Sequence, residues 1–129
     1  MAVFSTAVAN AMLDAIEVAT GASPTLLIYD AAQPADTSSA DVGVVLASMA
    51  LPADWMAAAA GRSKALLGTW QDAAANAAGT PVGFAIKQGA TVHMRGTASP
   101  TAGSGEIRFS NTPFTLSQQI DVTSFALSI

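Results

Sequence analysis

Residues 82–97, VGFAIKQGATVHMRGT, contain the clearest indication of the fold. On each side of the central Gln-Gly-Ala, apolar residues alternate with small or polar ones. A period of two is typical of a half-buried strand, and a glycine between two such runs is typical of a tight turn. We therefore predict an antiparallel hairpin, with Phe84 and Ile86 facing the core and His93 and Arg95 facing solvent.

Short strands are also predicted before and after this hairpin. Loops of small and polar residues separate them, such as AAQPADTSSAD at residues 31–41. The segment 53–63 is ambiguous between a helical turn and a packed loop. The other predicted strands cover residues 25–30, 42–51, 64–70, 107–109, 114–116 and 120–129.

One segment, residues 5–20, is predicted to be helical. Ser5 or Thr6 can cap its first turn, since a hydroxyl oxygen can accept a hydrogen bond from an unpaired amide there. Gly21 suits the left-handed conformation that often follows a helix, and Pro24 prevents its continuation.

Val8, Met12 and Ile16 recur every four residues and form an apolar stripe on this helix. An isolated helix of this length is marginally stable in water, so we expect the stripe to pack against another element. Two partners remain open, the sheet of its own domain and a neighbouring subunit. Val8, Met12 and Ile16 are therefore the candidate docking residues.

The pattern as a whole predicts a mainly β fold, an antiparallel β-sandwich or jelly-roll-like domain with one N-terminal α-helix. No repeat or linker divides the chain, so we expect a single domain over residues 1–129. The helix covers 5–20 and the β-sandwich covers 25–129.

The composition limits the possible functions. Hydrophobic residues make up 51% of the chain, but 29 of them are alanine, and only 11% of residues are charged. The net charge of −4 argues against a nucleic-acid partner. No run of apolar residues is long enough for a membrane span, and the basic segment that begins a signal peptide is missing, so we expect neither.

The charges are distributed unevenly. Residues 1–61 contain six acids and no Lys or Arg, whereas residues 62–129 contain five bases and three acids, so the halves carry −6 and +2. Chance on a lightly charged surface can explain this. The alternative is head-to-tail packing of copies in an assembly, with an acidic face against a basic one.

Catalytic patterns are missing from the sequence. There is no cysteine, the single His93 is expected at the surface, and no nucleophile elbow or phosphate-binding glycine loop occurs. We predict no catalytic residue, no bound metal and no cofactor. Trp55, Trp70 and Tyr29 could stack against a sugar, although packing in the core or against another subunit explains the tryptophans better.

Eight short motifs follow one another along the chain. They are NAMLDAI (10–16), GAS (21–23), LIYD (27–30), QPA (33–35), GTWQD (68–72), AGT (78–80), TVH (91–93) and VTSF (122–125). Taken in this order, they resemble a group of small structural proteins encoded by tailed bacteriophages and prophages. In size and expected fold the chain is also similar to capsid decoration, or cement, proteins.

The resemblance implies a virion structural protein, made in the host cytoplasm and located on the capsid surface. Its expected partner is the major capsid protein or another virion protein, and it is expected to form a homo-oligomer within the particle. Two alternatives remain: a structural protein of the tail, neck or head fibre, and a receptor- or carbohydrate-binding module.

Overall fold

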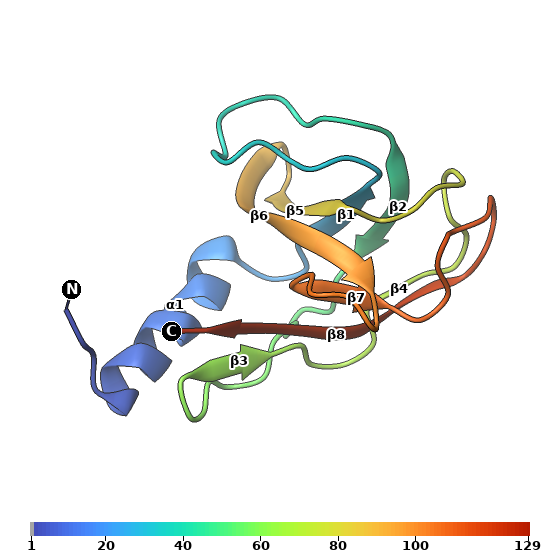
Figure 1. Cartoon of the computed structure of the whole chain (residues 1–129). Coiled ribbons are helices and arrows are strands. Elements are labelled where there is room, and N and C mark those ends of the chain that lie inside the picture. Colours follow the sequence, from blue (N-terminus) through green and yellow to red (C-terminus); the bar gives the residue numbers. More distant parts are fainter. Residues whose placement is uncertain (1) are drawn as a thin grey trace.

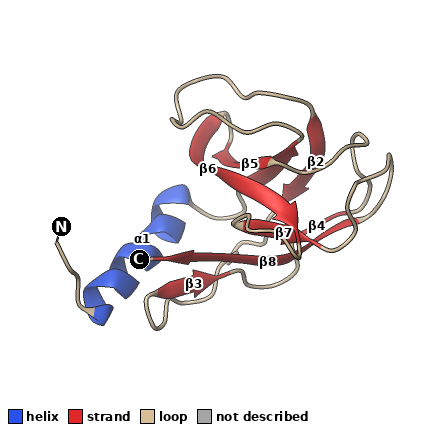
Figure 2. Cartoon of the chain, in the orientation of Figure 1, coloured by secondary structure: helices blue, strands red, loops and turns tan. Residues whose placement is uncertain are grey.

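The computed structural model describes residues 2–129, which form one helix and eight strands (Figures 1 and 2). The predicted helix and most predicted strands are present. The elements are α1 (Thr6–Thr20), β1 (Thr25–Tyr29), β2 (Val45–Ala50), β3 (Ser63–Ala65), β4 (Gln71–Asp72), β5 (Gly83–Gln88), β6 (Thr91–Pro100), β7 (Ile107–Phe109) and β8 (Ile120–Ser128).

The strands form one curled sheet in the order β2-β1-β5-β6-β7-β8-β3, with β4 also paired to β8. Every pair is antiparallel except β6–β7, which is parallel, so the sheet is mixed rather than purely antiparallel. The curl brings the segment around β4 beside β2. Ser48 N–H donates to the Asp72 carboxylate at 2.9 Å, and Asn76 N–H donates to Leu46 O at 2.8 Å. The fold is mainly β and resembles a sandwich.

The predicted hairpin is confirmed as β5 and β6, joined by a two-residue turn at Gly89 and Ala90. Gly89 has a φ of 61°, in the left-handed region that favours glycine. Gly96 is required for a different reason, because a Cβ there would lie 2.6 Å from the Phe84 ring. His93 is exposed, as predicted.

The prediction that Arg95 faces solvent is wrong, because only 5% of its side chain is exposed. The loop between β1 and β2 covers it. The Arg95 guanidinium donates to Asp36 O and Ser39 O and pairs with the Asp41 carboxylate. These contacts hold the loop over the hairpin.

Two strand predictions need correction. The predicted strand 64–70 is broken by Gly68, whose φ of 75° interrupts the extended backbone, and only its first residues belong to β3. The predicted strand 114–116 is a loop. Within it, Phe114 exchanges two backbone hydrogen bonds with Gly79, and Leu116 is exposed.

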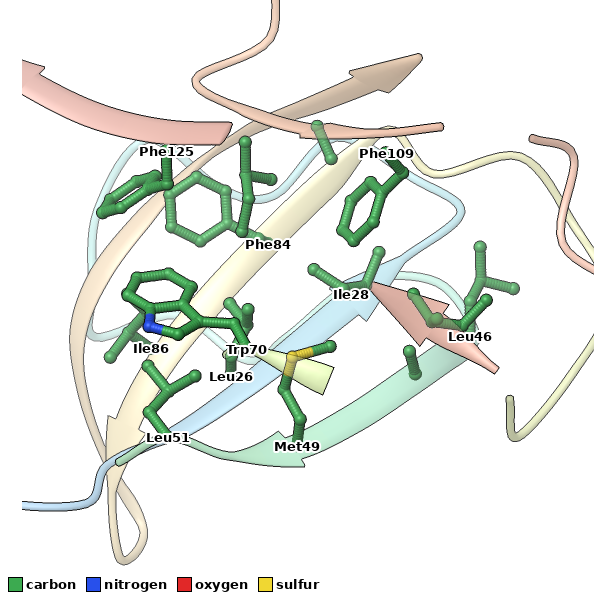
Figure 3. Close-up of a cluster of buried hydrophobic side chains, with 14 of the residues drawn as sticks. Leu26, Ile28, Leu46, Met49, Leu51, Trp70, Phe84, Ile86, Phe109 and Phe125 are labelled. Carbon is green, nitrogen blue, oxygen red and sulfur yellow. The ribbon is translucent and has the colours of Figure 1, made fainter. Parts of the chain in front are cut away.

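The core lies inside the curl. Figure 3 shows Phe109 of β7 and Phe125 of β8 directed toward Ile28 of β1 and Phe84 of β5, across the core. The Trp70 ring lies between Trp55 and Phe125, with centroid distances of 5.9 and 5.2 Å. Segment 53–63 is therefore a packed loop, and Trp55 anchors it in the core.

Candidate docking surface

Helix α1 lies at one side of the curled sheet, near β3 (Figure 1). Its ends agree with the caps expected from the sequence. Ser5 Oγ accepts a hydrogen bond from Val8 N–H at 3.3 Å, and Gly21 N–H donates to Glu17 O at 3.0 Å. The Trp55 indole donates to Gly21 O at 3.1 Å, so the C-terminal end of the helix is joined to the core.

The helix is attached to the body through polar side chains as well as apolar ones. Asn10, Asp14 and Glu17 accept hydrogen bonds from three backbone N–H groups of the loop between β2 and β3. The donors are Arg62 N–H (2.9 Å), Ala59 N–H (2.8 Å) and Met56 N–H (3.0 Å), respectively. A buried backbone N–H without a hydrogen-bond acceptor is costly. These three side chains therefore stabilise an irregular loop whose N–H groups are not all paired with a strand.

Lys64 lies beneath the helix with only 2% of its side chain exposed. Its Nζ lies 2.8 Å from the Asp14 carboxylate and 3.1 Å from that of Glu17. It also donates to Ala57 O at 2.8 Å. The three N–H donors of the ammonium group therefore have three acceptors, which a buried cation requires.

The electrostatics of this cluster favour the ionised forms. The hydrogen bond from Lys64 lowers the pKa of Asp14. Burial alone would raise the pKa of Glu17, but hydrogen bonds from Met56 N–H and Lys64 outweigh it and lower that pKa. Burial would likewise lower the pKa of Lys64, yet Asp14 and Glu17 raise it. Asp54 has a raised pKa because it shares a hydrogen bond with Glu17.

We expect the attachment of α1 to weaken in acid. Asp14 and Glu17 have folded-state pKa values below their unfolded ones, so their contribution is complete above pH about 4.5 and is lost as the pH falls further. The raised pKa of Asp54 offsets part of this loss. Urea unfolding at pH 7 and pH 3 measures the change.

The matched control for this acid effect is the Asp14→Asn, Glu17→Gln double variant, which has no carboxylates to protonate at these positions. Its unfolding free energy should depend less on pH than that of the wild type. An equal pH dependence in both proteins would show that the helix attachment does not titrate.

The opposite face of α1 is exposed and apolar. Val8 and Val18 are 47% and 82% exposed, and Met12 is 41% exposed. The other residues of this outward face are alanines. The face consists of Ala7, Val8, Ala11, Met12, Ala15, Val18 and Ala19, none of which is charged.

This arrangement reverses the usual amphipathic helix, whose apolar side faces the core. The candidate docking residues Val8 and Met12 do not pack on the sheet of their own domain, and Ile16 is only partly buried. The buried positions are Ala9, Leu13 and Thr20. The polar attachment was not predicted from the sequence, although Asn10, Asp14 and Glu17 also recur at helical spacing.

Both chain termini lie near the N-terminal end of α1. The Arg62 guanidinium donates to Phe4 O and, at 2.8 Å, to Ile129 O, so it joins residues near both termini. Phe4 and Ile129 are exposed, as is Val3. Three exposed apolar side chains thus lie close to the first turn of α1.

The aromatic residues considered for sugar stacking lie in the interior. Trp55 and Trp70 are buried in the core, which agrees with the favoured interpretation of the sequence. Tyr29 is buried too, and its hydroxyl donates to the Asp41 carboxylate. Stacking of a ligand on these three rings is therefore excluded in this conformation.

A second polar cluster holds the loop between β1 and β2. Asp41 accepts hydrogen bonds from Tyr29, Lys87 and Arg95. Burial alone would raise the pKa of Asp41, but these donors lower it to about 2. A hollow of about 390 Å³ lies beside the cluster, lined mainly by serine, threonine and alanine residues. The cluster serves to anchor the loop.

These two clusters also account for much of the charge asymmetry. Acids of the first half of the chain pair with bases of the second half within the same molecule, in the pairs Asp14–Lys64, Glu17–Lys64, Asp41–Lys87 and Asp41–Arg95. Packing between copies is not needed to pair them.

Two further results concern residues 2–129 only. They contain no group of three or more metal-ligating side chains placed to hold an ion. No helix among them is long and apolar enough to cross a membrane. Comparison with known proteins finds no matching family model, no significantly similar curated protein and no significantly similar solved structure.

Proposed function

We propose that this chain is a virion structural protein of a tailed bacteriophage, a head decoration protein that binds the shell of major capsid protein and stabilises it. The observation that carries the proposal is the outward face of α1. A continuous apolar patch on a small protein is typical of a contact site for another protein chain.

The attachment of α1 gives the outward face a fixed orientation. The hydrogen bonds that Asn10, Asp14 and Glu17 accept from the loop, together with the buried Lys64, fix the orientation of the helix. A surface that is already ordered loses little conformational entropy on binding. Few charged residues also reduce the cost of removing water from a broad interface.

The proposed mechanism is mechanical. Many copies, assembled as homo-oligomers on the capsid surface, would each form modest contacts across joints of the shell. Because the copies act together on one particle, weak individual contacts add up to a strong effect. The same surface suits a tail, neck or head-fibre protein, and copy number separates these placements.

Quantitative mass spectrometry of gradient-purified virions measures copies of this chain per copy of major capsid protein. A ratio near one, or a simple fraction such as one third, is expected for a decoration protein. A ratio in the low hundredths would instead indicate the tail or neck. Absence from the virion would contradict the proposal and leave a binding module as the better alternative.

Capsids that lack the protein should break at lower temperature or internal pressure, and added wild-type protein should restore them. The Val8→Asp, Met12→Asp variant should fold but fail to restore stability, because buried aspartates would be costly in the contact. The Val44→Asp, Leu116→Asp variant places the same charges at exposed apolar positions elsewhere and should restore it. Unchanged stability of capsids without the protein would refute the stabilising role.

A further inference from the structure

The outward face of α1 has a mirror symmetry in its sequence. Around Leu13, Ala7 corresponds to Ala19, Val8 to Val18 and Ala11 to Ala15. Each residue is identical to its counterpart, and all six are exposed. Met12 is the only member of the face without an apolar counterpart, since its position corresponds to Asp14.

The geometry of the helix places this symmetry on one surface. At about 100° per residue, the six positions are arranged evenly about a line directly opposite Leu13. Leu13 itself is buried against the body. Ala11 and Ala15 flank that line, Val8 and Val18 lie farther out, and the terminal alanines lie at the rim.

Such a face is complementary to a second copy of itself. In a two-fold contact between antiparallel helices, residue i of one copy meets residue j of the other, and j meets i. With Leu13 at the centre, Ala11 would face the partner's Ala15 and Val8 would face the partner's Val18. Alanines at the centre allow the two backbones to approach closely, and no charge lies between them.

The charges at the two ends of α1 favour the antiparallel direction. Arg62 lies at the N-terminal end, where it donates to Phe4 O. The exposed Asp54 lies toward the C-terminal end, beside Glu17, whose own carboxylate faces the body and is paired with Lys64. The first turn of the helix has no acidic residue and the last turn has no basic residue, so no side chain of α1 offsets the partial charges of the helix dipole at its two ends. An antiparallel neighbour places each positive end beside a negative one.

The available area indicates a reversible contact. A helix of 15 residues is about 22 Å long and about 10–12 Å across, so the outward half of its curved surface measures on the order of 400 Å². Two such faces would bury on the order of 800 Å² in total, and any contribution from the nearby Val3, Phe4 and Ile129 would bring the sum toward about 1,000 Å², below the usual range for stable complexes. The contact would therefore form at high local concentration, as on a particle surface.

We propose that the outward face of α1 binds the same face of a second copy, forming an antiparallel, two-fold dimer. The inference deepens the proposed function, because it assigns the face that carries that proposal to a contact between copies rather than to direct contact with the shell. If the protein decorates a shell, the dimer would be the assembling unit and the β body would remain available to contact the shell.

Disulfide crosslinking tests the register directly, because the natural chain has no cysteine. We would prepare Ala11→Cys and Ala15→Cys separately, oxidise each alone and as an equimolar mixture, and measure the dimer by non-reducing electrophoresis. Facing positions on closely packed helices satisfy the Cα separation of about 4.4–6.8 Å that a disulfide requires. The mixture should give at least tenfold more dimer than either variant alone.

Exposed Ala102→Cys, away from α1, controls for random collision and should crosslink no more than the separate variants. If each α1 variant oxidised alone gives as much dimer as the mixture, the helices pack in parallel and the proposal is overturned. No crosslink above the control would also overturn it, provided that circular dichroism shows folded protein.

Sedimentation of the cysteine-free protein provides an independent measurement. The wild type should show a concentration-dependent dimer, and Val8→Lys should weaken it at least tenfold, whereas exposed Val44→Lys should not. A strictly monomeric wild type would refute the dimer but leave the virion proposal intact, since copy number in purified virions tests that proposal separately.

Discussion

Replacing Trp70 by alanine should lower the free energy of unfolding by about 3–5 kcal/mol, the usual cost of deleting a buried large aromatic side chain. Trp70 is 1% exposed and lies between Trp55 and Phe125. Its indole N–H also donates to Trp55 O at 3.1 Å. For a chain of 129 residues, the melting temperature should fall by about 10–20 °C.

The effect should extend to α1, because Trp55 joins the core to the helix through Gly21 O. Trp70→Phe keeps most of the ring contacts but loses the hydrogen bond, so it should destabilise by less than half as much. Leu116→Ala, at a 66% exposed position, is the control and should change the free energy by less than about 0.5 kcal/mol. Similar melting temperatures for Trp70→Ala and this control would contradict the assigned core.

Local sequence patterns predicted the elements that depend on nearby residues. The hairpin β5–β6, the strand β1 and the long strand β8 follow from alternation, and the caps Ser5 and Gly21 mark the helix. The parallel pairing of β6 with β7 could not be predicted this way. It depends on contacts such as Ala98 opposite Ile107, which form only when the whole sheet has curled.

The orientation of α1 was the feature of the candidate site that the sequence did not determine. The apolar stripe through Val8 and Met12 suggested the packed face, because burial of apolar area usually dominates. The packing is instead decided by Lys64 and by unpaired N–H groups of an irregular loop, which require the carboxylates of Asp14 and Glu17. Such a loop has no periodic sequence pattern, so its hydrogen-bonding needs appear only in three dimensions.

Replacing Lys64 by methionine should destabilise the protein by about 3 kcal/mol at pH 7. This is the usual cost of removing one partner of a buried ion pair. The methionine leaves Asp14 and Glu17 close together without their cation and leaves Ala57 O without its donor. Because 46% of the Asp14 side chain is exposed, water relieves part of this cost. Urea unfolding followed by tryptophan fluorescence measures the loss.

Lys87→Met is the matched control, because it removes the same charge from another carboxylate. Asp41 keeps its hydrogen bonds from Tyr29 and Arg95 in that variant, and the Lys87 side chain is 20% exposed. The loss should therefore be about 1 kcal/mol, typical of a partly exposed pair. Equal losses in the two variants would show that Lys64 has no special role in holding α1.

The pH dependence of Lys64→Met gives a test that general destabilisation cannot imitate. Without the ammonium group, the folded-state pKa values of Asp14 and Glu17 should lie higher than in the wild type, while the hydrogen bonds from Ala59 N–H and Met56 N–H still lower them. Less stability is then lost when these carboxylates are protonated, so the fall in the free energy of unfolding from pH 7 to pH 3 should be smaller in Lys64→Met than in the wild type. An equal fall in both proteins would show that the two carboxylates do not depend on Lys64, and the attachment of α1 would have another origin.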